Sequence, residues 1–104
     1  MGIRRACSYC VRIKTLEPPD NYSDVLVTIQ QKNRNIISKT LASLDSDDTY
    51  IIMRLNQSET RELEAGIPTY LQFRGYIEEY NAPGSKCWPI EVQPALDDRI
   101  LGGD

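Results

Sequence analysis

The 104-residue chain is predicted to fold as one all-β domain, a β-sandwich of six or seven short strands with a single short helix. Two observations predict this fold class. Apolar residues recur at every second position in successive segments, which is the period of a strand with one buried side. Clusters of proline, glycine, asparagine and aspartate separate these segments at intervals of roughly 8 to 15 residues, as in sandwiches. The length suits one compact domain over residues 1–104.

The first 41 residues contain three predicted strands. Alternating apolar side chains place them at residues 7–16, 25–30 and 36–41. Two prolines and two polar residues at 18–21 interrupt the chain after the first strand, because proline cannot donate a hydrogen bond to a neighbouring strand. A polar turn at 32–35 joins the second and third strands, so this part is expected to form a hairpin.

The helix is predicted in the middle of the chain, after a strand at residues 50–55. Asn56 is followed three positions later by Glu59, which is typical of a capping box and predicts a helix around Gln57–Leu63. Gly66 is placed to end this helix. An isolated helix of two turns is unstable in water, so we expect it to be held by packing against the sheets.

The clearest alternation in the sequence begins at residue 69. One predicted face consists of small and apolar side chains, namely Thr69, Leu71, Phe73, Gly75 and Ile77. The opposite face consists of polar and aromatic side chains, namely Tyr70, Gln72, Arg74, Tyr76 and Glu78. A turn at 81–84 leads to a last strand in which Trp88, Ile90 and Val92 alternate with other residues. Pro89 predicts that this strand lies at a sheet edge, or that the missing N–H of the proline points away from a neighbour. A polar tail follows at 94–104.

The charge and composition exclude several functions. The formal charge of −3 and the pI near 4.9 argue against a general nucleic-acid binder, which needs a basic face. Residues 1–16 carry four cations and no acid, so the charge of −3 divides into +4 there and −7 over the remaining 88 residues. The chain has no histidine and three cysteines, which excludes catalytic triads with histidine and four-thiolate zinc sites. We expect no enzymatic activity and no cofactor.

Two short motifs resemble functional sites only superficially. Cys7 and Cys10 form a CxxC spacing, but in a strand these positions point to opposite faces about 10 Å apart, beyond the reach of a disulfide. The acidic loop at 45–48 lacks the glycine and the final bidentate acid of a calcium-binding loop. We therefore expect unpaired cysteines, no metal site and a solvated loop.

The polar face of the strand that begins at residue 69 is the candidate interface. Its residues are Tyr70, Gln72, Arg74 and Tyr76. Tyrosine and arginine are enriched among the residues that contribute most to binding a protein partner. The alternative is that these tyrosines simply cover a sheet face.

The sequence contains no apolar run of the length that a signal peptide or a membrane helix needs. We therefore expect the chain to be made and to fold in the cytosol of a bacterial host, without a membrane contact.

The order of these segments resembles a family of small proteins encoded beside tail and baseplate genes in phages and prophages of Gram-positive bacteria. In that family a strand ends in a Leu-Ser/Thr-Gln-Glu-Glu/Asp-Thr motif before a short helical turn, which corresponds to residues 55–60 here. An alternating strand with an arginine follows, as at Leu71, Phe73 and Arg74, and an acidic tail closes the chain, as at Leu96-Asp97-Asp98. The chain departs from the family pattern at residues 6–9 and at Trp88-Pro89.

The resemblance implies an immunoglobulin-like sandwich that acts as a non-enzymatic structural or assembly component of a tail or baseplate, and so a place in the virion. The expected partners are tail proteins or further copies of the chain, through a sheet face or edge. Two alternatives stay open. One is a carbohydrate-binding module that uses the tyrosine face, and the other is a small host-directed binding protein.

Overall fold

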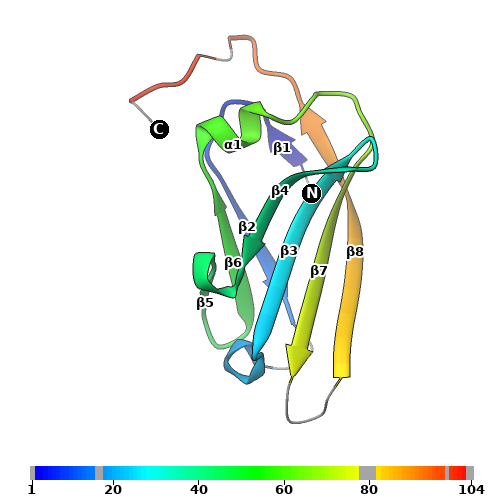
Figure 1. The fold of residues 1–104 in the computed structure, drawn as a ribbon. Coiled ribbons are helices and arrows are strands. Elements are labelled where there is room, and N and C mark those ends of the chain that lie inside the picture. The colour runs from blue at the N-terminus through cyan, green and yellow to red at the C-terminus, as the bar shows by residue number, and fades with distance from the viewer. Residues whose placement is uncertain (1, 16–17, 78–81, 98, 103–104) are drawn as a thin grey trace.

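The computed structural model describes residues 2–15, 18–77, 82–97 and 99–102 of the chain. Within them it contains eight strands in two sheets and one short α-helix (Figure 1). The elements are, in chain order, β1 (Gly2–Arg4), β2 (Tyr9–Lys14), the 3-10 turn η1 (Pro19–Asn21), β3 (Asp24–Gln31), β4 (Arg34–Thr40), the 3-10 turn η2 (Leu41–Ser43), β5 (Asp45–Ser46), β6 (Tyr50–Leu55), α1 (Gln57–Arg61), β7 (Thr69–Ile77) and β8 (Ala82–Gln93).

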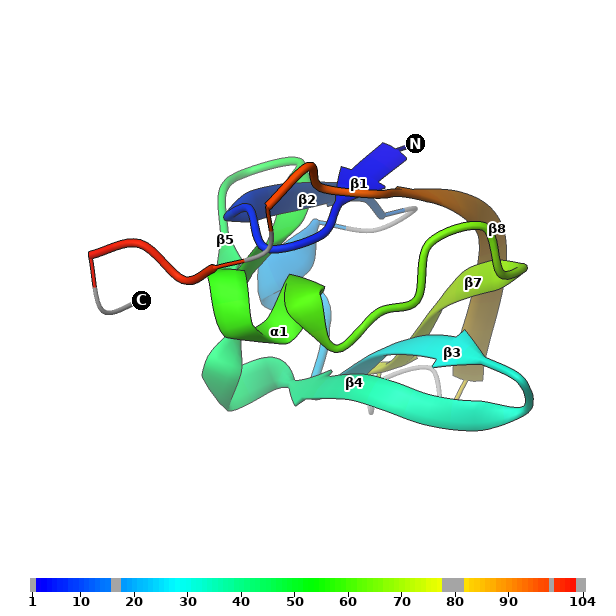
Figure 2. The same ribbon diagram turned by 90° about the horizontal axis from the view of Figure 1, so that it is seen from above.

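The two sheets have the strand order of an immunoglobulin-like sandwich. The larger sheet has the order β1-β8-β7-β3-β4, and it faces a sheet with the order β2-β6-β5 (Figures 1 and 2). The strands β2, β6 and β5 correspond to strands B, E and D of an immunoglobulin domain, and β3, β4, β7 and β8 correspond to C, C′, F and G. The predicted fold class is confirmed, and the short helix lies between the strands equivalent to E and F.

The beginning of the chain differs from the prediction of one strand over residues 7–16. β1 pairs in parallel with the end of β8, and β2 pairs with β6 in the other sheet. The chain crosses between the sheets through a turn at Ala6, which has a positive φ of 58°. Cys7 lies in this crossing and only Cys10 lies in β2. Residues 5–8 are needed for the crossing between the sheets, so the observed strand β2 begins at Tyr9, two residues after the predicted start.

The core lies between the sheets and uses the predicted alternation. The inward side of β7 is buried at all five positions from Thr69 to Ile77. The buried layer extends to the neighbouring strand β3, where the side chains of Val25, Val27 and Ile29 are 1% exposed or less. From the opposite sheet the buried side chains are Val11 and Ile13 of β2 and Ile51, Met53 and Leu55 of β6. The same pattern leaves the even-numbered residues of β7 on the outer surface, where the candidate interface lies.

The β3–β4 hairpin has a two-residue turn at Lys32 and Asn33. Both residues have positive φ, 52° and 59°, as a type I′ turn requires. This turn matches the right-handed twist of paired strands, so the predicted polar turn is confirmed. A register shift between Ile29 and Gln30, just before the turn, leaves one extra residue on β4.

The helix α1 begins as predicted but ends earlier. Asn56 Oδ1 accepts from the Glu59 N–H at 2.8 Å, and Glu59 Oε1 accepts from the Asn56 N–H at 3.0 Å, which completes the capping box. The helix ends at Arg61, five residues before Gly66, so the prediction that Gly66 ends the helix is wrong. The Arg5 guanidinium instead donates to the carbonyl oxygens of Leu63 and Arg61 at 2.7 and 2.9 Å. These bonds satisfy carbonyls at the helix end and tie the segment after β1 to it.

In the described part of the chain, none of the helical segments has the length and apolar character needed to cross a membrane.

Candidate protein-binding face on the five-stranded sheet

The four predicted interface residues lie together on the outward side of β7, in the middle of the larger sheet. The strand register places Gln30 of β3 and Pro89 of β8 on either side of Tyr70. In the next row, Thr28 and Cys87 flank Gln72 in the same way. We call the outward side chains of β3, β7 and β8 the sheet face. Because β7 has a strand on each side over its whole length, these side chains stand on rigid backbone.

The sheet face is uncharged immediately beside Tyr70, where its strand neighbours are Gln30 and Pro89. Charged side chains on the described part of the face lie further away: Arg74 of β7, Asp24 at the start of β3 and Glu91 near the end of β8. Tyr70 is exposed over 48% of its surface, whereas Tyr76 is half-buried. Depletion of charge around an exposed aromatic side chain is typical of the central part of protein–protein interfaces.

Two hollows border the Tyr70 end of this face. They meet at Ile67 and Pro68, in the loop before β7, and have volumes of about 220 and 700 Å³. The smaller is lined by Gln30, Lys32, Asn33, Ile67, Pro68 and Tyr70. The larger is lined by Gly66, Ile67, Pro68, Pro89, Ile90, Glu91, Val92 and Pro94. The apolar part of the candidate site is therefore concentrated at Tyr70 and not spread along β7.

The sequence did not indicate that Ile67, Pro68 and Pro89 join Tyr70. They come from the loop before β7 and from β8, and the pairing of β7 with β8 brings Pro89 opposite Tyr70. The one sequence signal for an exposed loop beside Tyr70 was Ile67-Pro68 directly before the predicted strand, because a proline at such a position is typical of an exposed loop.

The spacing of the tyrosines bears on the carbohydrate alternative. Tyr70 and Tyr76 are six residues apart on one strand, which separates them by about 20 Å. One sugar ring cannot contact both side chains across that distance, so a carbohydrate that uses both tyrosines would have to be an extended oligosaccharide.

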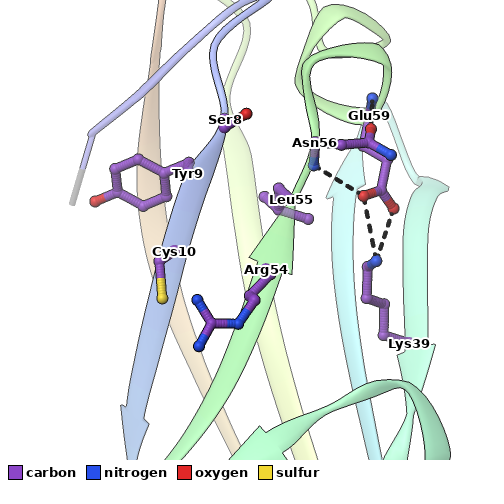
Figure 3. A pocket seen from close by; sticks show the side chains of 8 residues that line it. All are labelled: Ser8, Tyr9, Cys10, Lys39, Arg54, Leu55, Asn56 and Glu59. Atoms are coloured by element: carbon purple, nitrogen blue, oxygen red, sulfur yellow. Dashed lines mark hydrogen bonds and ion pairs between the residues drawn. The ribbon is translucent and has the colours of Figure 1, made fainter. Parts of the chain in front are cut away.

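A third hollow of about 470 Å³ lies where α1 meets the ends of β2 and β6 (Figure 3). Its lining is Ser8, Tyr9, Cys10, Lys39, Arg54, Leu55, Asn56 and Glu59. Lys39 Nζ lies 2.9 and 3.2 Å from the two carboxylate oxygens of Glu59, one of which also accepts from the Asn56 N–H. This ion pair joins β4 to the start of α1, so the charged groups in this hollow have a structural role.

The cysteines are exposed free thiols. Cys7, Cys10 and Cys87 lie in the crossing before β2, in β2 and in β8 respectively. The predicted reason for the separation of Cys7 and Cys10 was wrong, because the two residues do not share a strand. Cys10 lies opposite Arg54 in the β2–β6 pair, and Arg54 Nε donates to Asp45 Oδ2 at 2.9 Å. That hydrogen bond raises the pKa of Arg54.

The acidic residues at 45–48 organise a tight turn. Asp45 belongs to the two-residue strand β5, which was not predicted. Asp47 Oδ1 accepts from the N–H groups of Thr49 and Tyr50 at 2.9 and 2.7 Å, and these bonds lower the pKa of Asp47. Among the residues that the structure describes, no three acids or cysteines are grouped as metal ligands.

Neither a protein-family model nor a curated protein matches the chain. The sheet face therefore has to be interpreted from its own geometry. That geometry combines an exposed aromatic side chain, an apolar border and a cation on a rigid sheet.

Proposed function

We propose that the chain is a non-enzymatic binding module that contacts a protein partner through the sheet face, as a structural or assembly component of a phage or prophage tail or baseplate. The observation that carries the proposal is the exposed Tyr70, flanked by uncharged strand neighbours at the apolar end of the sheet face. The tail or baseplate setting is supported by the sequence resemblance alone, because one fold serves many functions.

The proposed contact has an anchor and a recognition group. Tyr70 supplies a large amphipathic side chain beside Pro68 and Pro89, whose rings lose no side-chain entropy on binding. Arg74 lies four residues further along β7, about 13 Å away, and supplies a planar cation for a carboxylate or carbonyl of the partner. Rigid backbone under both side chains lowers the entropy cost of binding.

The first test is site-specific photo-crosslinking in cells that make the chain from its native gene together with the neighbouring genes. A photo-reactive phenylalanine analogue replaces Tyr70 in one variant and Arg54, on the outward side of the opposite sheet, in the control. The proposal expects a discrete crosslinked protein from position 70 and none from position 54. Equal products at both positions, or none at position 70, would contradict it.

The second test measures affinity for the protein that the crosslink identifies. A Tyr70→Ala/Arg74→Ala double variant should bind about 30-fold more weakly or worse, which corresponds to at least about 2 kcal/mol. Arg54→Ala should bind as the wild type does. Glycan-array binding that depends on Tyr70, with no protein partner, would favour the carbohydrate alternative.

A further inference from the structure

The open edge between the two sheets, on the β2 and β8 side, carries a second site away from the sheet face. β1 pairs only with residues Glu91–Gln93 at the end of β8. Over residues 82–90, none of the described strands pairs with the outer side of β8, so the sandwich is uncovered there (Figures 1 and 2). β8 is not an edge strand as a whole, because β1 flanks its end, but Pro89 lies on this uncovered length and has no described strand on its outer side.

The backbone of this edge is poorly suited to pairing with another strand. The Arg5 N–H donates to the Gln93 carbonyl at 3.0 Å, so the backbone of Gln93 points toward β1. Backbone groups of every second residue in a strand point to the same side, so the backbone of Pro89, four residues before Gln93, also faces the edge. Proline has no N–H to donate there. A partner at this edge would therefore have to be recognised mainly by side chains.

Those side chains form a basic and aromatic groove of about 240 Å³. We call it the edge groove, and it is lined by Arg12, Ile13, Lys14, Tyr50, Lys86 and Trp88. The Arg12 guanidinium lies 5.2 Å from the centre of the Tyr50 ring, and Lys86 Nζ lies 5.3 Å from the centre of the Trp88 ring. Each aromatic ring thus has a cation over it.

The edge groove has a charge opposite to that of most of the chain. It holds three cations, and within the described part of the chain Arg12 pairs with Asp47 at 3.3 Å between exposed side chains. Such an exposed pair is weak and leaves a net positive groove. The chain after residue 16 carries −7, so an acidic segment of a second copy is a complementary ligand.

The end of the chain has the matching chemistry. We call the described residues 94–97 and 99–102 the C-terminal arm, and they lie over the α1 end of the sandwich (Figure 1). Leu96 is fully exposed and Leu101 is 73% exposed. Residues 94–104 carry three aspartates against one cation, Arg99, which pairs with Asp97 at 2.7 Å between exposed side chains. The arm thus carries apolar and acidic side chains together.

The arm does not reach the edge groove of its own chain. Gln57 holds it by donating to the Leu101 carbonyl at 2.7 Å and accepting from the Leu101 N–H at 2.8 Å. Gln57 is seven residues beyond Tyr50, and β6 accounts for most of that separation, which makes the distance about 20 Å. An occupant from this chain must therefore come from another copy.

We propose that the C-terminal arm of one copy binds in the edge groove of the next. Leu96 packs against the Trp88 and Tyr50 rings, and Asp97 exchanges its exposed ion pair with Arg99 for one with Lys14 or Lys86. The contact joins two different surfaces, so it is heterologous and each copy keeps one free arm and one free groove. It uses none of the residues of the sheet face, so it stands or falls independently of the proposed partner contact.

The experiment uses two full-length variants and analytical ultracentrifugation at low ionic strength. The groove variant is Lys14→Glu/Lys86→Glu and the arm variant is Leu96→Ser/Leu101→Ser, all at exposed positions. Wild type should associate as concentration rises, and each variant alone should associate about tenfold more weakly or worse. Mixing the two variants should give a one-to-one dimer, because the groove variant retains an arm and the arm variant retains a groove.

Trp88 gives an independent readout, because it is the only tryptophan of the chain. Its fluorescence should shift with concentration in wild type and in the Tyr70→Ala/Arg74→Ala variant, and not in either variant of the arm or the groove. A monomeric wild type at every concentration would overturn the proposal. So would association that the Tyr70 and Arg74 changes abolish, or a mixture of the two variants that stays monomeric.

Discussion

Gln31 is the residue whose replacement most directly tests how this sandwich is held together. It ends β3 on the inward side, is 2% exposed, and its amide spans from β3 to the loop before β7. Nε2 donates to the Glu64 carbonyl at 2.9 Å and to Thr69 Oγ1 at 2.8 Å, and Oε1 accepts from the Glu64 N–H at 3.0 Å. Gln31→Met keeps an unbranched side chain of similar length and removes all three bonds.

The expected cost follows from those three bonds. Each contributes about 1 kcal/mol to the free energy of unfolding, so their loss costs about 3 kcal/mol. The more apolar methionine recovers part of this, about 1 kcal/mol, because its burial removes more apolar surface from water. The net decrease in the free energy of unfolding is therefore about 2 kcal/mol, which lowers Tm by about 10 °C.

Urea unfolding followed by far-UV circular dichroism measures this difference, with Gln30→Met as the matched control. Gln30 is the preceding residue, is half-buried on the outward side, and has one long side-chain bond to Asn35 at 3.4 Å. The control should change stability by less than about 0.5 kcal/mol. A Gln31→Met protein as stable as wild type would refute the reasoning, since the buried amide would then contribute nothing.

Three further predictions concern other elements. Gly75→Ala should lower the free energy of unfolding in urea by about 1 to 3 kcal/mol, because the new Cβ would lie 2.7 Å from Cδ1 of the Tyr22 ring. In a Tyr22→Ala background the glycine change should be nearly neutral, and an equal cost in both backgrounds would contradict the prediction. Thr60→Val should lower the free energy of unfolding by about 2 kcal/mol, because the buried hydroxyl accepts from the Cys7 N–H and donates to the Cys7 carbonyl; a more stable variant would contradict it. Carboxyl NMR should show a pKa of Asp97 below the usual aspartate value, because the hydrogen bond from the Arg99 guanidinium lowers it. Arg99→Ala should raise this pKa. The ionised, paired form of Asp97 is lost as pH falls through the folded-state pKa.

Much of the fold was accessible from local sequence because alternation and turn chemistry are local properties. The strand β6 was predicted with its observed bounds, and the burial of Thr69, Leu71 and Phe73 follows directly from period two. The capping box at Asn56 was also visible, since its two partners are three residues apart. The sheet-face residues of β7 were found for the same reason.

The errors occur where contacts between distant segments decide the structure. The helix ends through bonds from Arg5, which is 56 residues away from Arg61, and not at Gly66. β1 exists because residues Gly2–Arg4 pair with Glu91–Gln93 at the other end of the chain. Gln31 occupies a core position because residues of the 64–69 loop complete its hydrogen bonds. None of these partners lies within the range of a local pattern.

The sequence by itself determined the class of fold, the inward and outward sides of the central strands and the start of the helix, because each depends on residues two to four positions apart. The tertiary structure alone decided which strands are neighbours. That pairing places Pro89 beside Tyr70, and the packing of the two sheets brings Lys86 and Trp88 of β8 against Arg12 and Lys14 of β2. Binding surfaces are built across strands, so they follow from sheet order, which is set by the joint burial of the core.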